Sequence, residues 1–392
     1  MRALADDPAN EVVCVGETRN LKGRPPLHPR LRVLGYQMPE PVPSQAHPYL
    51  RDYEAHVRRG QQVVRLLLQL RDTQGFQPDV VVAHPGWGEA LFLRDVFPRA
   101  RHVQYFEFYY HGQGADVGFD PEFPASLDDL LRVRSKNSTQ LQSVVAADAG
   151  LSPTAWQKSR YPLELQSKIS VVHDGIDTEV VRPDPQAWVQ INGQRLAAGD
   201  EVVTYVARNL EPYRGFHVFM RMLPRLQALR PQAKFVIVGG DDVSYGRRLP
   251  EGENYRLLYR KEVEAQVDWS KVFFVGKLPY GDYLKVLQVS AAHVYLTYPF
   301  VLSWSALEAM AAGCLIVGSR TPPVEEVVTD GESGLLVDFF DADALAAKLA
   351  QVLADPGAYR GLRAAARRAV QERYDLRTVC LPRTLEVIRP GP

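Results

Sequence analysis

The chain has 392 residues, of which 46% are hydrophobic and 23% charged, as is ordinary for a globular protein. Its 46 basic residues balance its 46 acidic residues, so no net field favours nucleic acid or a membrane surface as a partner. No apolar run approaches the roughly 18 residues of a membrane span. Cys14, Cys314 and Cys380 lack metal-ligand spacing, which predicts reduced, structural cysteines in a cytoplasmic protein of two or three domains.

The first predicted elements are a strand, an irregular segment and a long helix. Residues 11–16 (EVVCVG) predict a strand, whereas the many prolines of residues 21–48 indicate an irregular surface segment. Residues 48–72 have the period of an amphipathic helix. We expect its buried face to comprise Val57, Val64, Leu67, Leu68 and Leu70, and its other face to carry Arg51, Arg58, Arg59, Arg65 and Arg71. A solvated arginine face is favoured over contact with anionic lipid.

Strands and helices alternate through the rest of the chain. The first half continues with a strand, loop and helix at 78–97, a strand at 102–110, a long helix at 126–149 and a strand at 167–177. In the second half we predict strands at 201–208, 234–240, 271–276, 293–299 and 314–319, and helices at 214–229, 280–291, 344–353 and 359–374. This pattern predicts an α/β fold with two doubly wound parallel sheets facing a cleft. The predicted domains are residues 1–177 and 178–372, with residues 373–392 crossing back to the first.

The stretch 298–319 (YPFVLSWSALEAMAAGCLIVGS) predicts a loop, a helix and a buried strand in quick succession. Ser303 or Ser305 can cap the helix, Ser305 and Glu308 have capping-box spacing, and Gly313 ends the helix. The free N–H groups and the dipole of a helix start suit a phosphate. Glu308 either accepts hydrogen bonds from sugar hydroxyls or only closes its own cap.

Other candidate ligand-binding residues stand at predicted strand ends, where open parallel sheets bind ligands. Arg208 and Arg214 can pair a diphosphate, with a surface ion pair to Glu211 as the alternative. Gly239 and Gly240 allow close backbone approach or merely a turn. Lys277 follows a strand facing the same cleft.

In the first half, His84 and Glu107 also follow predicted strands. A lone histidine at such a place is more often structural than catalytic. The sequence contains no phosphate-binding GxxxxGK[ST] loop, no GxSxG or HExxH motif, and no aspartate pair with metal spacing, so we predict neither a metal nor a cofactor.

Taken in order, these segments resemble the retaining, nucleotide-sugar-dependent glycosyltransferases of family 4, which have the GT-B fold. The resemblance is carried by Arg208, by Arg214-Gly215, and by the segments SVVHDGIDTEVVRPD, VFFVGKLPYGDYLKVLQVSAAHVYLTYP, LEAMAAGCLIVGS and PPVEEVVTDGESGLLVD. It implies two Rossmann-like domains and metal-independent transfer of a sugar, with retention of configuration, to a glycan, lipid or small molecule. It is typical of polysaccharide biosynthesis in the cytoplasm, including the inner face of the membrane with peripheral membrane contact.

The resemblance also implies roles for single residues. Arg208 and Arg214 would hold the donor diphosphate together with the helix start at Ser303, Trp304 and Ser305. Glu308 would bind the ribose, and Gly239 and Lys277 would line the donor site. Glu107 stands roughly where many relatives place a histidine near the donor sugar, and His84 matches a histidine of the preceding strand and loop. These two residues are the catalytic candidates.

The sequence departs from the family pattern at two places. The family usually carries two glutamates with seven residues between them; Glu308 matches the second, but Phe300 stands at the first. The family also starts with a strand and a glycine-rich loop that residues 1–11 do not match, so we expect a natural product longer by about 15–25 residues. Two alternatives to a transferase therefore stay open: a sugar-nucleotide-binding protein without turnover, and a sugar-nucleotide epimerase of the same fold.

Overall fold

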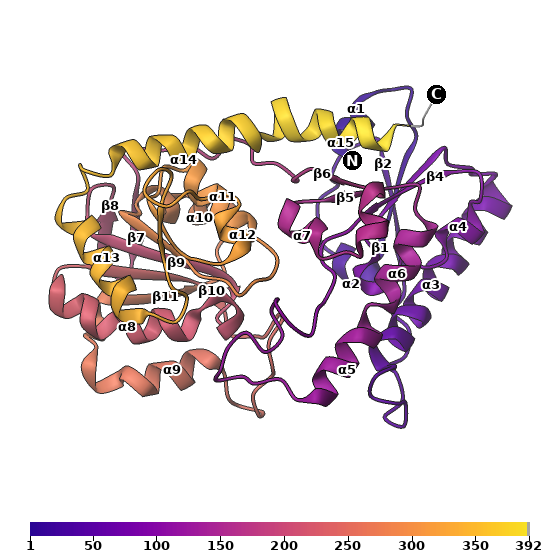
Figure 1. The fold of residues 1–392 in the computed structure, drawn as a ribbon. Helices are drawn as coiled ribbons and strands as arrows, with labels where there is room; N and C mark the ends of the chain where they lie inside the picture. Colours follow the sequence, from indigo (N-terminus) through magenta and orange to yellow (C-terminus); the bar gives the residue numbers. More distant parts are fainter. Residues whose placement is uncertain (390–392) are drawn as a thin grey trace.

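The computed structural model describes residues 1–389, which form two α/β halves side by side (Figure 1). In the first half the strands are β1 (Val12–Glu17), β2 (Leu31–Tyr36), β3 (Val80–Ala83), β4 (Arg101–Tyr105), β5 (Ala149–Ser152) and β6 (Ile169–Val171). Its helices are α1 (Arg2–Asp6), α2 (Thr18–Leu21), α3 (Arg51–Gln74), α4 (Leu93–Val96), α5 (Leu127–Lys136), α6 (Ser138–Ala146) and α7 (Ala155–Ser159), with 3-10 turns η1 (Pro85–Trp87) and η2 (Leu163–Lys168).

The second half begins with a hairpin and continues with alternating strands and helices. Its strands are β7 (Trp188–Ile191), β8 (Gln194–Ala197), β9 (Val202–Asn209), β10 (Lys234–Gly240), β11 (Val272–Gly276), β12 (Ala292–Tyr295), β13 (Ile316–Ser319) and β14 (Leu335–Val337). Its helices are α8 (Phe216–Leu229), α9 (Tyr255–Val263), α10 (Tyr280–Gln288), α11 (Trp304–Ala311), α12 (Pro322–Glu325), α13 (Ala342–Ala354), α14 (Arg360–Arg373) and α15 (Leu381–Ile388). Short turns are η3 (Pro212–Arg214), η4 (Glu264–Gln266), η5 (Trp269–Lys271) and the π-helical η6 (Leu376–Cys380).

The sheet of the second half is parallel, in the order β11-β10-β9-β12-β13-β14. All four residues of β12 and of β13 are buried, because helices cover both faces of the sheet. Phe216, Phe219 and Met220 of α8 belong to the largest apolar cluster on this sheet. The order reverses direction after β11, so β9 and β12 meet at the switch point, where open sheets bind ligands.

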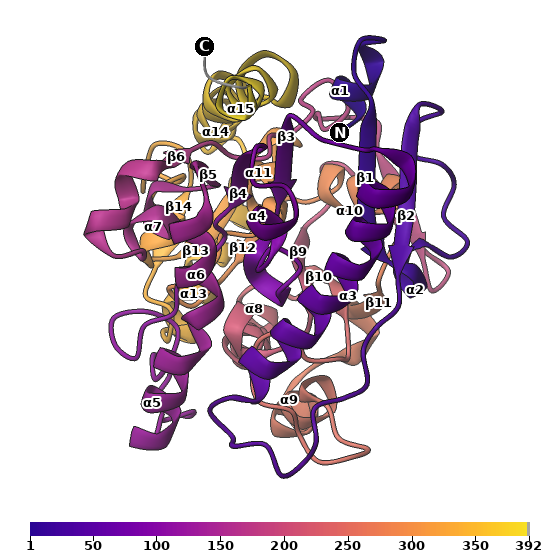
Figure 2. The same cartoon turned by 90° about the vertical axis from the view of Figure 1, so that its right-hand side faces the viewer.

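The sheet of the first half is divided. Strands β3-β4-β5-β6 form one parallel sheet, and β1-β2 form a separate parallel pair. Figure 2 shows the pair standing apart from the four-stranded sheet, with α3 lying between them in the view. The expected doubly wound arrangement is therefore present, but its first sheet is not continuous.

Several predicted elements of the first half were wrong. The proline-rich segment 21–48 contains β2, which pairs with β1 in register. Strand β4 ends at Tyr105 rather than at residue 110. The long helix predicted at 126–149 is divided at Asn137, whose side chain bonds both the N–H and the carbonyl of Tyr110, and its last residue, Ala149, is the first residue of β5. A tertiary hydrogen-bond pair thus overrode helical propensity.

The carboxyl-terminal helices run along one side of both halves (Figure 1). Ile176 and the segment after α14 exchange backbone hydrogen bonds. Gly175 has a positive φ of 87° there, and a Cβ on it would lie 2.6 Å from Leu376 Cα, so both the conformation and the space favour glycine. Further on, Arg383 of α15 donates to the Val171 carbonyl at 3.1 Å, and Arg101 donates to the Val387 carbonyl at 3.2 Å. Helix α15 is thereby bound to the first half.

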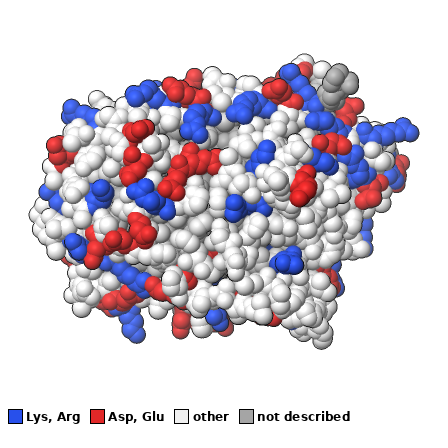
Figure 3. Space-filling view, in the orientation of Figure 1, with Lys and Arg blue, Asp and Glu red and all other residues white. Residues whose placement is uncertain are grey.

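The three cysteines are free thiols, as predicted, and Cys314 and Cys380 are buried. Within residues 1–389, no helix combines the length and the apolarity that crossing a membrane requires. On the face shown in Figure 3, basic and acidic side chains are interspersed, in keeping with the balanced composition.

Candidate active site

Arg214 is a buried cation at the carboxyl end of the second sheet. It ends η3, the turn that follows β9, and it is 7% exposed. Its Nη1 donates to Thr297 Oγ1 at 2.7 Å and to the Val301 carbonyl at 2.8 Å. No carboxylate of residues 1–389 lies within ion-pair distance of it. A buried guanidinium without a counter-ion is costly unless an anion binds there, so the residue marks an anion site.

Arg208, near the end of β9, is exposed and likewise forms no ion pair within the described part of the chain. The alternative of a surface ion pair with Glu211 is wrong. The Glu211 carboxylate is 1% exposed and accepts backbone N–H groups of Ser244, Tyr245 and Gly246 at 2.9–3.1 Å. Glu211 therefore holds the loop after β10, and Arg208 is left free for a ligand.

The start of α11 is capped differently from the capping box that the sequence predicted. The cap is Ser303, whose Oγ accepts from Ser305 N at 3.4 Å, and Trp304 beside it is 57% exposed. Glu308 does not reach back to Ser305. Instead its two carboxylate oxygens accept the hydroxyls of Tyr280 and Tyr283, each at 2.8 Å.

This arrangement holds Glu308 in place while leaving lone pairs for another partner. Tyr280 and Tyr283 stand three residues apart on α10, so both hydroxyls come from one face of that helix. Each carboxylate oxygen accepts more than one hydrogen bond. The interpretation that Glu308 only closes its own cap is therefore wrong.

Gly239, at the end of β10, is required by packing rather than by a turn, because a Cβ there would lie 2.7 Å from Leu210 Cδ2 and 2.9 Å from the Ala207 carbonyl oxygen. A Cβ on Gly240 would lie 2.6 Å from Lys277 Cε, which belongs to a flexible side chain that can move aside. Lys277, which is exposed, therefore crosses directly over the Gly240 backbone. The structure brings Lys277 to the end of β10, the strand adjacent to the one that ends near Arg208.

His84 and Glu107 meet after the neighbouring strands β3 and β4. The His84 Nε2 lies 3.3 Å from Glu107 Oε2. Its Nδ1 accepts the N–H of Gly86 at 3.0 Å, which leaves Nε2 as the nitrogen that carries the proton towards Glu107. The imidazole stacks between Trp87 and Tyr105, at centroid distances of 4.7 and 5.6 Å. Both side chains are partly exposed, so they remain available to a ligand.

Phe300, at the position of the family's first glutamate, is only 3% exposed. Its ring packs against three aromatic rings, with centroid distances of 4.7 Å to Phe108 of the first half, 4.9 Å to Tyr245 and 5.6 Å to Tyr213. Sequence reasoning missed this aromatic cluster, although the aromatic residues of FEFYY and YPF were a signal. The site therefore has an apolar wall where the family pattern has a charge.

A second feature that the sequence did not reveal is the docking of the loop after β4 on the second half. The Tyr298 hydroxyl donates to Asp120 at 2.6 Å, and His217 lies 3.0 Å from the same carboxylate. Nearby, Tyr213 donates to Asp116 at 3.0 Å. Asp120 and His217 are buried, so these contacts hold the two halves together beside the arginines.

Asp120, His217 and Glu122 also lie close enough to form a three-residue group of metal-ligand type. Each carboxylate already has a partner, because Glu122 pairs with Arg221 and Asp120 accepts the Tyr298 hydroxyl. The guanidinium of Arg221 next to this group disfavours a second cation. We therefore interpret the group as an interdomain contact.

Asp116 provides a pH-dependent test of that contact. Burial raises the pKa of its carboxyl above the ordinary range, so the folded state binds its proton more tightly than the unfolded state. Stability is then lost as pH rises from the unfolded pKa of about 3.9 through the higher folded pKa. Asp116→Asn keeps an acceptor for Tyr213 without the charge, and we expect it to gain on the order of 1 kcal/mol at pH 7.

The measurement is the thermal midpoint of the parent and of Asp116→Asn between pH 4 and pH 8. The difference in thermal midpoint between the two proteins should shrink towards pH 4, because the parent carboxyl is then protonated and uncharged. Glu253→Gln, which changes an exposed carboxylate, is the control and should show no such trend. A variant less stable than the parent at pH 7 would contradict the assignment of a costly buried charge.

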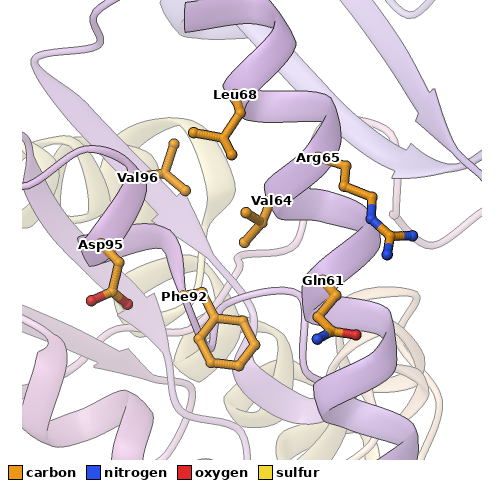
Figure 4. Close-up of a pocket in the computed structure, with 7 residues that line it drawn as sticks. All are labelled: Gln61, Val64, Arg65, Leu68, Phe92, Asp95 and Val96. Atoms are coloured by element: carbon orange, nitrogen blue, oxygen red, sulfur yellow. The ribbon is translucent and has the colours of Figure 1, made fainter.

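The arginines of α3 do not form a free cationic face. Arg51 donates to the carbonyls of Ala46 and Ser44, Arg58 pairs with Glu54, Arg59 with Glu89, and Arg71 with Asp72. Arg65 borders a pocket of about 490 Å³ between α3 and α4. Figure 4 shows Val64, Leu68 and Val96 lining it, with Arg65 turned outward. None of the predicted site residues lines this pocket, so it is separate from the candidate active site.

Comparisons with known proteins agree with the resemblance. Residues 8–181 match the family described as "Glycosyl transferase family 4 group", and residues 188–369 match "Glycosyl transferases group 1". The D-inositol 3-phosphate glycosyltransferase of Acidothermus cellulolyticus is 30% identical over 224 residues, which cover 55% of this chain and 47% of that protein. A GDP-mannose-dependent phosphatidylinositol monomannoside mannosyltransferase of Mycolicibacterium smegmatis is 25% identical over 251 residues, which cover 59% of this chain and 60% of that protein. The chain matches about half the length of such curated relatives.

Solved structures with the same fold extend over nearly the whole chain. Sucrose-phosphate synthase from Thermosynechococcus elongatus superimposes with a TM-score of 0.72 at 19% identity, covering 96% of this chain and 88% of that one. Anabaena HepE in complex with UDP-glucose superimposes with a TM-score of 0.65 at 15% identity, and the match covers 96% of this chain and 99% of the HepE chain. Together with the two halves of the family match, these likenesses show that the chain belongs to the group 1 family-4 glycosyltransferases and has the GT-B fold.

Proposed function

We propose that the chain transfers a sugar from a nucleotide diphosphate sugar to an acceptor hydroxyl, with retention of configuration and without a metal. The observation that carries the proposal is Arg214, a buried cation with no carboxylate partner among residues 1–389. The ligand that suits it is an anion, and Arg208 and the start of α11 lie on the same side of the sheet to share a diphosphate.

The chemistry follows from these positions. As the glycosidic bond breaks, negative charge develops on the leaving diphosphate, and fixed cations and helix N–H groups stabilise it. One such preorganised donor is worth about 3 kcal/mol of barrier. Arg208 and Arg214 would carry this role, and Glu308, fixed by Tyr280 and Tyr283, would accept the ribose hydroxyls.

The His84 and Glu107 pair stands in the first half and would face the sugar and the acceptor. At rest the Glu107 Oε2 lies 3.3 Å from the His84 Nε2, and an acceptor hydroxyl would take the place of that N–H group beside the carboxylate. Phe300 is buried and supplies no carboxylate at this position, so polar contacts to the sugar must come from other groups, with Ser303, Ser305 and Lys277 as candidates.

The relatives supply the donors to test first: UDP-glucose, which is bound to HepE, and GDP-mannose, which the mannosyltransferase requires. A glycan, a lipid-linked sugar or a small polyol would serve as acceptor. Purified protein is incubated with each donor and acceptor, with and without a chelator, and released nucleoside diphosphate and the anomeric proton of the product are followed.

Transfer with a retained anomeric configuration in the presence of the chelator supports the proposal. Binding of nucleotide without release of diphosphate from any donor would instead identify a binding protein. A changed donor sugar without a new glycosidic bond would identify an epimerase. A strict requirement for Mg²⁺ or Mn²⁺ would contradict the role given to the arginines.

The assignment of Glu308 to the ribose leads to a specific prediction. Glu308→Gln should weaken binding of UDP or GDP by about 1.5–3 kcal/mol, because it removes charge-assisted hydrogen bonds to the ribose hydroxyls. The parent should also bind the ribonucleotide more tightly than its 2′-deoxy form, and the variant should lose that preference. Calorimetry with both nucleotides measures the two effects.

Tyr280→Phe is the matched control, since it removes one hydrogen bond to Glu308 while keeping the carboxylate. It should retain most of the preference for the ribonucleotide. An unchanged preference in Glu308→Gln would place the ribose elsewhere in the cleft.

A further inference from the structure

The loop between β10 and α9, residues 241–254, carries an exposed tyrosine beside the buried Arg214. The Tyr245 ring centroid lies 5.5 Å from the Cζ of Arg214 and 4.9 Å from the centroid of the Phe300 ring. Tyr245 is 37% exposed, whereas Tyr295, whose hydroxyl also contacts the guanidinium, is 2% exposed. Tyr245 is therefore an aromatic neighbour of Arg214 that a ligand can reach.

The Glu211 carboxylate holds this tyrosine in place. Its Oε1 accepts the N–H of Ser244 at 3.1 Å, and its Oε2 accepts the N–H groups of Tyr245 at 3.1 Å and of Gly246 at 2.9 Å. Successive backbone N–H groups that converge on one point form an anion-binding concavity, and here Glu211 fills it. Glu211 also directly precedes η3, the turn that ends at Arg214. One carboxylate thus joins the turn that carries Arg214 to the loop that carries Tyr245.

This use of a buried carboxylate favours a functional position for the loop over simple packing. Glu211 is 1% exposed, and no Lys, Arg or His of residues 1–389 lies within ion-pair distance of it. Burial of an ionised carboxylate is costly, and only its hydrogen bonds offset that cost. Beyond the three bonded N–H groups the loop meets solvent, since Arg247 and Arg248 are exposed and form no ion pair in the described chain. The loop is therefore fixed where Tyr245 stands and open to solvent beside it.

The Tyr245 hydroxyl lies close to the cation. Burial acts to lower the pKa of the Arg214 guanidinium, but the hydroxyls of Tyr295 and Tyr245 beside it raise that pKa. An anion bound to Arg214 would meet the Tyr245 hydroxyl as a second donor. Hydrogen bonds to ionised oxygens are about twice as strong as neutral ones, and they strengthen further where a ring excludes water.

We propose that residues 241–249 form a lid over the diphosphate site, in which the Tyr245 hydroxyl donates a hydrogen bond to a phosphate oxygen and Glu211 is the positioning residue that holds Tyr245 there. This lid rests on the proposed function, since it presupposes a nucleoside diphosphate at Arg214. Tyr245 belongs to none of the segments that carry the family resemblance. It is thus a ligand contact particular to this chain.

Calorimetry with UDP, GDP and inorganic pyrophosphate tests the contact. Tyr245→Phe keeps the ring and removes the hydroxyl, so it should weaken binding of each ligand about tenfold without changing the thermal midpoint. Glu211→Gln should weaken binding in the parent but not in Tyr245→Ala, because Glu211 acts through Tyr245. The control is Tyr359→Phe, which changes a half-buried tyrosine at the start of α14 and should bind all three ligands as the parent does.

Trypsin provides a readout that requires no turnover. Because Arg247 and Arg248 are exposed, the lid contains two cleavage sites. Saturating UDP should slow cleavage there several-fold in the parent, and it should protect Tyr245→Phe less at equal saturation. Glu211→Gln should speed cleavage of the free protein. Cleavage after Lys22, in an exposed segment of the first half, is the internal control and should not respond to UDP.

The outcomes separate the lid from the diphosphate site itself. Equal affinities of the parent and Tyr245→Phe would overturn the lid while the diphosphate site stands. Tighter binding by Tyr245→Ala would also overturn it, because the ring would then block the site. Additive losses in Glu211→Gln and Tyr245→Ala would contradict the positioning role of Glu211. A parent that binds none of the three ligands would overturn the proposed function and the lid together.

Discussion

Arg214→Ala is expected to weaken binding of nucleoside diphosphates by about 1.5–3 kcal/mol, which is the range for hydrogen bonds to charged groups. The same change should also lower the free energy of unfolding by about 1–3 kcal/mol, because Thr297 Oγ1 and the buried Val301 carbonyl lose their donor. An arginine that reached into an open cleft would contribute little to stability, but Arg214 is only 7% exposed.

Arg208→Ala is the matched control, because Arg208 is exposed and has no partner in the described chain. It should weaken nucleotide binding in the same way while changing stability by less than about 0.5 kcal/mol. Calorimetry with UDP and GDP gives the affinities, and denaturant unfolding gives the stabilities. Unaltered nucleotide affinity in both variants would contradict the diphosphate assignment. Equal losses of stability would contradict the different environments of the two side chains.

Phe300→Glu, which restores the residue type of the family pattern, is expected to destabilise the protein by several kcal/mol rather than to improve it. The new carboxylate would be buried against Phe108, Tyr213 and Tyr245, and burial without a partner disfavours its charged form. Its folded pKa would then lie above its unfolded pKa, so the loss of stability should grow as pH rises from 5 to 8.

Thermal unfolding of Phe300→Glu at several pH values measures this effect. Phe300→Leu is the control; it keeps an apolar side chain and should cost less than Phe300→Ala, for which about 3–5 kcal/mol is expected. A stable, more active Phe300→Glu would show that the aromatic cluster opens to admit a charged side chain, against the packing described here.

Local sequence patterns determined the order of elements and much of the candidate site. Apolar runs such as KFVIVGG and KVFFVG predicted β10 and β11, and Gly313 ended α11 as expected, with a φ of 84°. His84 and Glu107 follow neighbouring parallel strands, so the order of the strands was enough to bring them together. Such signals depend on residues close together in the chain, which is why they could be read without coordinates.

Only the tertiary structure decided which groups these residues bind. Glu308 has capping-box spacing from Ser305, but its carboxylate oxygens accept hydrogen bonds from two tyrosine hydroxyls of α10 instead. Glu211 stands three residues before Arg214 and could have paired with it, but the Glu211 carboxylate accepts hydrogen bonds from the backbone N–H groups of residues 244–246 instead. In both cases the carboxylate is bound by groups distant in sequence rather than by the neighbouring residue that the spacing indicated. Spacing along one chain segment cannot reveal such a competitor, because its position depends on how sheets and helices pack.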